Sequence, residues 1–216
     1  MSPLLCLAVW LGGASVAFGQ TSWRDSLAVL QQQIRHNPAD MDLRLRKAAV
    51  NIELEQWEYA VEEYGRVLQH EPHNLTAHFF RAYAFVQQRQ LPMAAADYEA
   101  VLQQLPSHFA ARLGLAEVRR KQGRRSDALD QLNMLVQQHP DSATAWAMRA
   151  TYEEEIALDG LKTDADGNPR ATLSRQAVGW LETAEYDWQQ AAQLAPGRYD
   201  FKRALRRVRR LMRNED

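Results

Sequence analysis

The sequence has 216 residues, 46% hydrophobic residues and a formal net charge of −1, which suits a chain of ordinary globular size with a real core. So small a net charge creates no whole-protein field that would attract nucleic acid. The only cysteine is Cys6, so removal of the leader described next would exclude disulfides, zinc–thiolate sites and cysteine nucleophiles together.

Residues 1–19 are expected to form an export signal. They carry no charge, and the apolar run from Leu4 to Phe18 is shorter than the roughly 20 residues that a membrane-spanning helix needs. Ala17-Phe18-Gly19 is a small-x-small site, typical of signal-peptide cleavage. Because the segment lacks an early Lys or Arg, an uncleaved anchor and a mis-assigned start codon are the alternatives. We expect an exported protein, periplasmic or associated with the cell envelope.

From Pro38 onward the sequence repeats every 34 residues, and several residue types keep one register. Chance does not align so many positions over three periods, so the chain is built from repeated structural units. The aligned residues are Pro38, Pro72, Pro106 and Pro140; Ala48, Ala82, Ala116 and Ala150; Ala60, Ala94 and Ala128; and Tyr64, Tyr98 and Leu132.

Each period contains two helical patterns. In the second pattern of the first period, Trp57, Ala60, Val61 and Tyr64 stand at i, i+3, i+4 and i+7, the apolar stripe of an amphipathic helix. The recurring alanines are expected where two antiparallel helices cross, because larger side chains would push the helix axes apart. The large residue near position 24 of each period then fills the space towards the next repeat.

Turn-forming residues separate these helices. The recurring proline ends the second helix, because proline has no N–H and disfavours helical backbone in the residue before it. Between the two helices of a pair, Gly123 can take a positive φ and end the first helix, and Pro92 suits the first turn of the second.

The pattern resembles the tetratricopeptide repeat (TPR), a helix–turn–helix unit of 34 residues. The match rests on a small residue at position 8, a large one at 17, alanine at 20, an aromatic residue or leucine at 24 and proline at 32. Trp146 matches the family's tryptophan at position 4, whereas Arg44, His78 and Arg112 depart from it. Over residues 22–213 the resemblance implies an all-α, TPR-type α-solenoid: a right-handed superhelix of antiparallel helix pairs with an elongated last hairpin and a C-terminal capping helix.

The same register predicts the domain organisation. The first unit is half present, since Trp23 to Asn37 matches a second helix alone. The expected segments are a signal peptide (1–19), an N-terminal capping half-repeat (20–40), TPR 1 (41–74), TPR 2 (75–108), TPR 3 (109–142), TPR 4 with an insertion at about 157–178 (143–197) and a basic C-terminal capping helix (198–216).

The insertion in TPR 4 is centred on residues 159–170, DGLKTDADGNPR, which are dense in turn formers. One interpretation is an elongated helical hairpin whose extra turns pack on each other, and the other is a projecting arm that contacts a partner. Asp164, Asp166 and Asn168 imitate the start of a calcium-binding loop, but Arg175 stands where a bidentate glutamate is required. A polar turn is the expected reading.

The sequence contains no motif of a catalytic site. It lacks GxSxG, a phosphate loop and a dinucleotide fingerprint. Most of the six histidines lie in or beside the proline turns, where solvated side chains are expected, and Pro72 inside HEPH prevents the helical pair of a zinc protease. We expect no enzymatic activity, no metal and no cofactor.

The inner face of a TPR stack is lined by the first helices, which suits a peptide or a partner helix. By register, the resemblance places these candidates there: Leu45, Phe79, Tyr83, Leu113, Glu117, Arg120, Lys121, Thr151 and Glu154. We call them the groove candidates; Phe79 and Tyr83 would serve as anchors, and Arg120 and Lys121 would orient a carboxylate. The alternative is that Phe79 packs on the neighbouring helix and the charges are solvated. Ala49 replaces the asparagine of chaperone-binding TPRs, so co-chaperone activity is not implied.

The tail from Arg198 to Asp216 carries a net charge of +5, which leaves −6 on the rest of the chain. It reads as a helix whose apolar face, with Phe201, Leu205 and Val208, covers the last repeat. The expected function is a non-enzymatic, exported scaffold or adaptor that binds another protein, of unknown identity, in its concave groove. No nucleic acid is expected. The alternative is a membrane-surface or envelope assembly component tethered through the basic helix.

Overall fold

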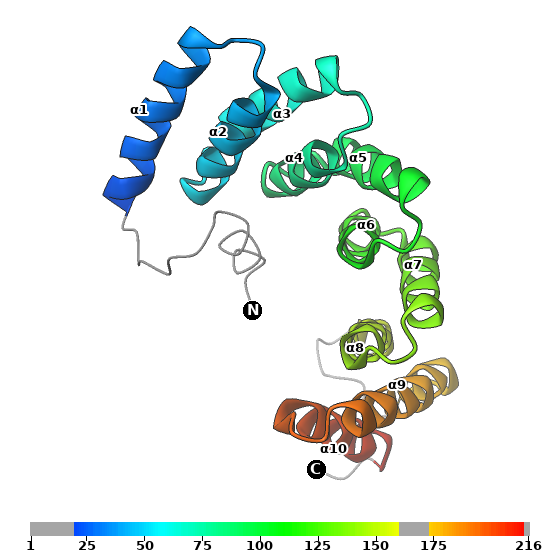
Figure 1. The fold of residues 1–216 in the computed structure, drawn as a ribbon. Helices are drawn as coiled ribbons and strands as arrows, with labels where there is room; N and C mark the ends of the chain where they lie inside the picture. The colour runs from blue at the N-terminus through cyan, green and yellow to red at the C-terminus, as the bar shows by residue number, and fades with distance from the viewer. Residues whose placement is uncertain (1–19, 160–172, 214–216) are drawn as a thin grey trace, which may run out of the picture. The chain divides into compact units, whose positions relative to one another are not determined.

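The computed structural model describes residues 20–159 and 173–213, and their secondary structure is entirely helical (Figure 1). The predicted leader and the centre of the insertion, with its calcium-like residues, lie outside the described residues. The helices are α1 (Gln20–His36), α2 (Met41–Glu53), α3 (Trp57–His70), α4 (Leu75–Gln87), α5 (Leu91–Gln104), α6 (Phe109–Lys121), α7 (Arg125–Gln138), α8 (Ala143–Asp159), α9 (Arg175–Leu194) and α10 (Tyr199–Arg213).

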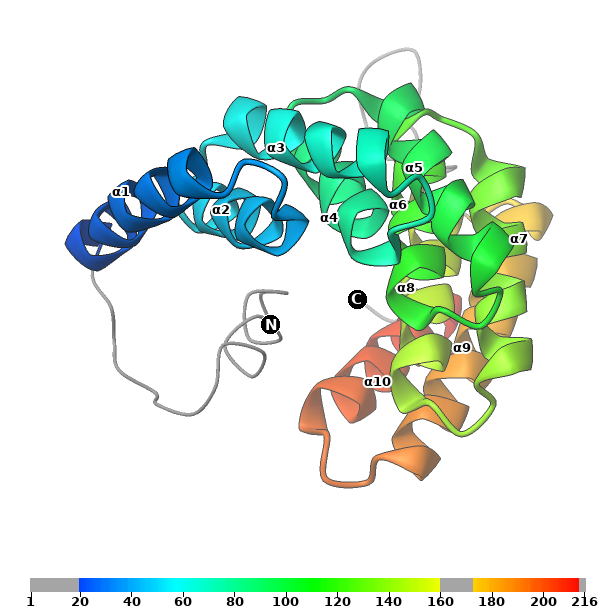
Figure 2. The ribbon, with the colours of Figure 1, turned by 45° about the horizontal axis from the view of Figure 1, so that its top comes forward.

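The chain forms two compact units, which divide between Val118 and Arg119 within α6. We call the part up to Val118 unit 1 and the part from Arg119 unit 2. In unit 1, α2, α4 and the unit 1 part of α6 lie along one side, and α3 and α5 along the other (Figure 2). These are the first and the second helices of the predicted pairs.

Each predicted proline corner has the same local structure. Proline is the second residue of a turn that the amide of the fourth residue closes on the carbonyl of the first, at 3.0 to 3.3 Å for Asn37–Asp40, Glu71–Asn74, Leu105–His108 and His139–Ser142. That fourth residue then caps the next helix: Asp40, Asn74, His108 and Ser142 accept a bond from the amide three residues on. The prolines therefore mark equivalent corners.

The corners between the two helices of a pair also recur. Gly123 has φ of 74°, which confirms the predicted left-handed end of α6. The equivalent residues one and two periods earlier, Arg89 and Glu55, have φ of 59° and 56°. Two non-glycine residues thus hold a left-handed conformation because the repeat geometry requires it there.

The recurring small and large residues form the core as expected. The alanines at positions 8 and 20, from Ala48 and Ala60 to Ala150 and Ala184, are at most 3% exposed. The residues at position 24, Tyr64, Tyr98, Leu132 and Trp188, are buried, with at most 7% exposure. Close helix crossings and a large neighbour at each crossing therefore stabilise the stack.

The last hairpin is elongated, as one of the two interpretations predicted. α8 and α9 have 17 and 20 residues, whereas α2 and α3 have 13 and 14. In the added turns, Ala157, Ala177 and Leu181 are buried in one apolar cluster, so the extra turns pack on each other. The capping helix α10 buries Phe201, Ala204 and Val208 in the same cluster. None of the described helices combines the length and apolar composition needed to cross a membrane.

Candidate functional site

Buried acidic residues on the second helices bind the cations of the first helices. In the first repeat, Glu63 of α3 is 2% exposed and accepts Arg44 Nη1 at 3.1 Å and Lys47 Nζ at 2.7 Å, both from α2. In the second repeat, Asp97 of α5 takes the place of Glu63. These ion pairs fix each first helix against its own second helix.

Asp97 holds two side chains of α4, Arg81 and His78. Arg81 donates from Nε to Oδ2 at 2.7 Å and from Nη2 to Oδ1 at 2.8 Å, and His78 Nδ1 lies 2.7 Å from Oδ1. His78 Nε2 lies 3.0 Å from the carbonyl oxygen of Pro72. Both ring nitrogens therefore lie within hydrogen-bond distance of an acceptor, which fixes the ring of His78 between Asp97 and the proline corner.

Position 4 of each repeat makes the same contact whether it holds the family's tryptophan or a polar residue. Each side chain at this position reaches the carbonyl oxygen of the proline six residues earlier. The pairs are Arg44–Pro38 at 3.1 Å, His78–Pro72 at 3.0 Å, Arg112–Pro106 at 2.5 Å and Trp146–Pro140 at 2.8 Å. A guanidinium, an imidazole and an indole N–H all supply the donor that this corner needs.

One turn histidine contradicts the expectation of solvated side chains, and the sixth histidine, His78, lies within α4. His78 is partly buried in the contacts just described, and His108 caps α6 by accepting the amide of Ala111 at Nδ1. The ring of His108 also lies 5.3 Å from that of Phe79. His70 and His73 are exposed, as expected. Sequence position alone missed this, because a corner histidine points either to solvent or back to the backbone.

The groove candidates of unit 1 lie on its first helices and are partly exposed: Leu45, Phe79, Tyr83, Leu113 and Glu117. Phe79 packs on the ring of Tyr98 with centroids 5.8 Å apart, and on Phe80 at 5.1 Å. Phe79 therefore packs on the neighbouring helix, as the alternative interpretation predicted, and is also partly exposed on the surface. Together with the partly exposed Ala49 and Val86, these five residues define what we call the unit 1 face.

Tyr83 is the aromatic centre of the unit 1 face. Its ring meets Trp57 of α3 edge to face, with centroids 5.9 Å apart. Burial raises the pKa of Tyr83, and the charges of Glu53 and Glu55 raise it further. Glu53, on the last turn of α2, is itself partly buried, and burial raises its pKa. The repeat register predicted Tyr83 as a groove residue, but it did not predict that Trp57 contacts it.

The groove candidates of unit 2 are engaged in contacts of their own. Arg120 Nη1 donates to Glu155 Oε1 at 2.8 Å, and the Thr151 hydroxyl donates to the Ala147 carbonyl at 2.7 Å. Lys121 and Thr151 are exposed, and Arg120 is partly exposed. All three residues belong to unit 2.

Glu154 corrects the sequence expectation of an accessible groove residue. It is only 3% exposed, and its carboxylate accepts the indole N–H of Trp188 and the guanidinium of Arg207. Trp188 comes from α9 and Arg207 from α10, so the C-terminal capping helix covers this position. The register could not show this, because α10 lies outside the repeat.

A second buried acid, Glu153, lies next to the ion pair between Arg149 and Asp187. Arg149 binds Asp187 through Nε at 2.6 Å and Nη2 at 2.8 Å, but its Nε is 3.9 Å from Glu153 Oε1. Glu153 Oε2 is buried without a hydrogen-bond partner. Burial and the nearby Asp187 raise the pKa of Glu153 to about 8. This cluster lies in the core of unit 2, and among the described residues no group of three or more potential metal ligands occurs.

Comparison with known families agrees with this geometry. Two tetratricopeptide-repeat profiles match the sequence, at residues 50–109 and 85–152. This chain is a tetratricopeptide-repeat protein. The helix pairs, the alanine crossings and the proline corners are thus TPR features, and the polar residue at position 4 is a variation within them. A comparison with curated proteins found no match.

Solved TPR proteins share the fold. MamA from Desulfovibrio magneticus is similar with a TM-score of 0.65 and 15% identity, over 82% of this chain and 88% of that one. A thermophilic TPR protein of Thermus thermophilus has a TM-score of 0.60 and 15% identity, over 95% of both chains. A TPR protein from Parabacteroides merdae has a TM-score of 0.57 and 19% identity, over 88% and 79%. At such identities the likeness concerns the fold.

Proposed function

We propose that this protein is a non-enzymatic scaffold or adaptor that binds a peptide or a helix of another protein in the concave groove, through the unit 1 face. TPR folds support protein–protein interaction, and this coarser role follows from the family. The observation that carries the finer proposal is a row of partly exposed apolar and aromatic side chains on three successive first helices: Leu45 on α2, Phe79 and Tyr83 on α4, and Leu113 on α6. Such residues serve as anchors at protein interfaces.

Capture of the partner from cells tests this proposal. The chain should retain a discrete partner that Tyr83→Ala loses, because removing an aromatic anchor typically weakens an interface by about 2 kcal/mol or more. Tyr59, which is 60% exposed on α3, supplies the matched control: Tyr59→Ala should leave capture unchanged. Equal capture by wild type and Tyr83→Ala would reject the unit 1 face as the site.

Export is part of the proposal and is supported by the uncharged apolar run between Leu4 and Phe18. An exported scaffold would work in the periplasm or at the cell envelope. Fractionation of cells that produce the full chain, followed by N-terminal sequencing, tests it. Recovery with Gln20 at the N-terminus outside the cytoplasm is the expected result, and an intact N-terminus in the cytoplasm would contradict it.

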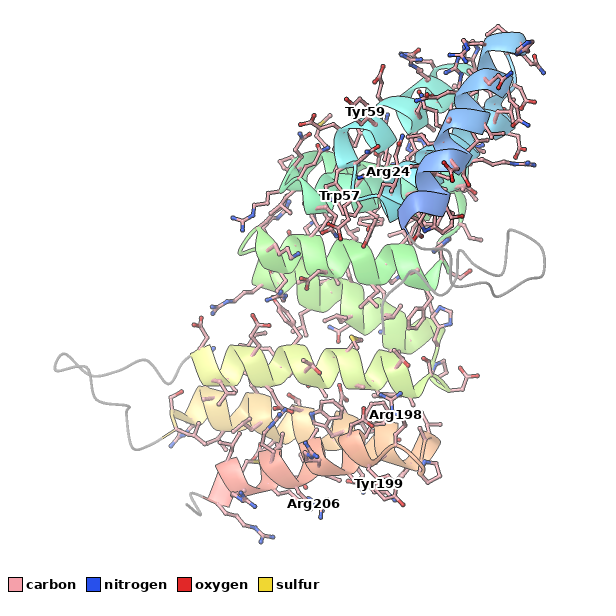
Figure 3. All side chains as sticks on the ribbon, turned by 90° about the vertical axis from the view of Figure 1, so that its left-hand side faces the viewer. Arg24, Trp57, Tyr59, Arg198, Tyr199 and Arg206 are labelled. Atoms are coloured by element: carbon pink, nitrogen blue, oxygen red, sulfur yellow. The ribbon has the colours of Figure 1, made fainter. Side chains whose placement is uncertain are left out.

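A second candidate function, attachment to an anionic surface, rests on α10. Lys202, Arg203, Arg206, Arg210 and Arg213 are exposed, and among the described residues no acidic side chain pairs with any of them. Their spacing of three and four residues puts them on one side of α10 together with Tyr199, which is 79% exposed. Figure 3 labels Arg206 and Tyr199 on this helix. Because the apolar face of α10 is buried in unit 2, the contact would be electrostatic rather than inserted.

Vesicle flotation separates the two candidates. If α10 tethers the protein, the full chain should float with vesicles that contain phosphatidylserine, and salt should release it. Replacement of Arg203, Arg206 and Arg210 by glutamine should abolish flotation, whereas Arg209→Gln, at a residue paired with Glu185, should have a smaller effect. Flotation that ignores these charges would reject the tether.

A further inference from the structure

The lysine and arginine side chains of α2 and α4 are paired with acids of the chain itself. Arg44 and Lys47 are bound to Glu63, and Arg81 is bound to Asp97. Arg46 pairs with Asp42 one helical turn away, at 2.6 Å. The buried acids of the second helices therefore hold most of these positive charges on the side of each first helix that faces its partner helix.

Glu53 is in the opposite situation. It is partly buried at the edge of the unit 1 face, and among the described residues no cation or hydrogen-bond donor pairs with it. It is the last residue of α2, where the partial negative charge of the helix terminus adds to its own charge, and the exposed Glu55 follows. A half-desolvated carboxylate in a negative field is stabilised by an incoming cation.

One aromatic ring lies near this carboxylate, and a second ring packs against the first. Tyr83 is close enough to Glu53 for the glutamate charge to raise the pKa of Tyr83, and Trp57 meets Tyr83 edge to face. Ring faces of tyrosine and tryptophan attract ammonium and guanidinium groups. The acid and the rings thus favour the same kind of ligand through two independent interactions.

Two acids on α8, the first helix of the last hairpin, are paired with arginines of the chain itself. Glu154 is bound by Arg207, and Glu155 by Arg120. Glu53 stands at the same position of its repeat as Glu155, although α2 ends there and α8 continues to Asp159. Among the described residues no arginine pairs with Glu53 as Arg120 pairs with Glu155. The missing cation is the feature that a partner could supply.

We propose that the unit 1 face selects partner segments that combine apolar side chains with a lysine or arginine, and that Glu53 receives this cation beside the rings of Tyr83 and Trp57. The inference rests on the proposed function, because it names the chemistry of the partner for the same face. Apolar side chains of the segment would cover Leu45, Phe79 and Leu113. The charge of the segment would be opposite to the carboxylate that chaperone-type TPRs clamp.

Peptide selection against the full chain tests the inference with a defined probe, a displayed library of random 12-residue peptides. Peptides that bind wild type but not Tyr83→Ala are kept, which restricts the set to the unit 1 face. We expect this set to be enriched in peptides with apolar residues and at least one lysine or arginine. Their affinity, measured by fluorescence anisotropy, should fall about tenfold with Glu53→Gln, the loss typical of one charge-assisted hydrogen bond.

Two controls make the result specific. Glu58→Gln removes an exposed acid of α3 and should leave affinity unchanged. A peptide whose lysine or arginine is replaced by glutamine should bind equally to wild type and Glu53→Gln, which completes a double-mutant cycle. Circular dichroism of each variant verifies that the helical fold is retained.

The outcomes separate this inference from the proposed function. Peptides that depend on Tyr83 but show no preference for lysine or arginine, or are indifferent to Glu53→Gln, would overturn the inference and leave the groove proposal standing. If the library contains no peptide that depends on Tyr83, both the inference and the proposed site are rejected.

Discussion

Gly114 on α6 lies directly against the ring of Tyr98 on α5: a methyl group on Gly114 would come within 2.5 Å of Tyr98 Cζ. Glycine is the only residue that fits this crossing without displacing the tyrosine. Because the contact involves the side chain at position 24, it belongs to the packing that joins one repeat to the next.

Gly114→Ala should therefore destabilise unit 1, although alanine is the better helix former. Intrinsic propensity alone favours alanine by about 1 kcal/mol, and overpacking costs about 1–3 kcal/mol, so we expect a net loss. Gly179→Ala is the matched control, since nothing lies within 4 Å of the added methyl, and it should stabilise α9. Urea midpoints measure both; a higher midpoint for Gly114→Ala would contradict the close packing.

The buried ion pair between Asp97 and Arg81 should contribute far more than a surface pair. Asp97→Ala leaves the guanidinium of Arg81 and the ring of His78 without their acceptor and should cost about 3 kcal/mol. Asp97→Glu should recover part of this loss, because the first repeat uses Glu63 at the same position. Glu62→Ala, which removes an exposed pair with Arg66, should cost less than about 1 kcal/mol. Equal costs would show that Asp97 does not hold the helix pair together.

Glu153 should make the stability of unit 2 depend on pH. Its pKa is about 8 in the folded chain and about 4.5 when unperturbed, so the folded state binds the proton more tightly. The contribution is favourable below pH 4.5 and is lost as the pH rises from there to 8. Relative to wild type, Glu153→Gln should gain stability over this range. Thermal unfolding from pH 4.5 to 8.5 measures the difference, with Glu155→Gln as an exposed control; a constant difference would exclude the buried acid as its source.

The left-handed corners should respond to glycine in opposite ways. Gly123→Ala forces a side chain into positive φ and should cost about 1–2 kcal/mol. Arg89→Gly relieves the same strain at the equivalent corner, so it should be neutral or slightly stabilising. Chemical denaturation of both variants checks the pair. A large loss with Arg89→Gly would mean that the arginine side chain stabilises the corner by contacts.

Much of the fold was predictable because it depends on local rules repeated in register. Pro72 and Pro106 end helices by lacking an N–H, Gly123 takes a positive φ, and Ala48 and Ala60 permit a close crossing; each effect needs only the residue and its neighbours in sequence. The repeat then multiplies a weak local signal into a reliable one.

The details of the candidate site were less predictable because they depend on contacts outside the repeat. Glu154 has the register of a groove residue, yet α10 and Arg207 bury it. His108 stands in a proline turn, yet its ring caps α6 and lies against Phe79. In both cases, which side chain supplies the partner was decided by three-dimensional packing, and no spacing rule identified it.

The central claim, that the unit 1 face receives the partner, is tested most directly by site-specific photocrosslinking in cells that produce the full chain. A photoreactive phenylalanine replaces Tyr83 on the unit 1 face in one strain and the exposed Tyr59 of α3 in another. The account predicts a discrete crosslinked adduct from position 83 and none from position 59. An adduct from position 59 with none from position 83 would contradict it.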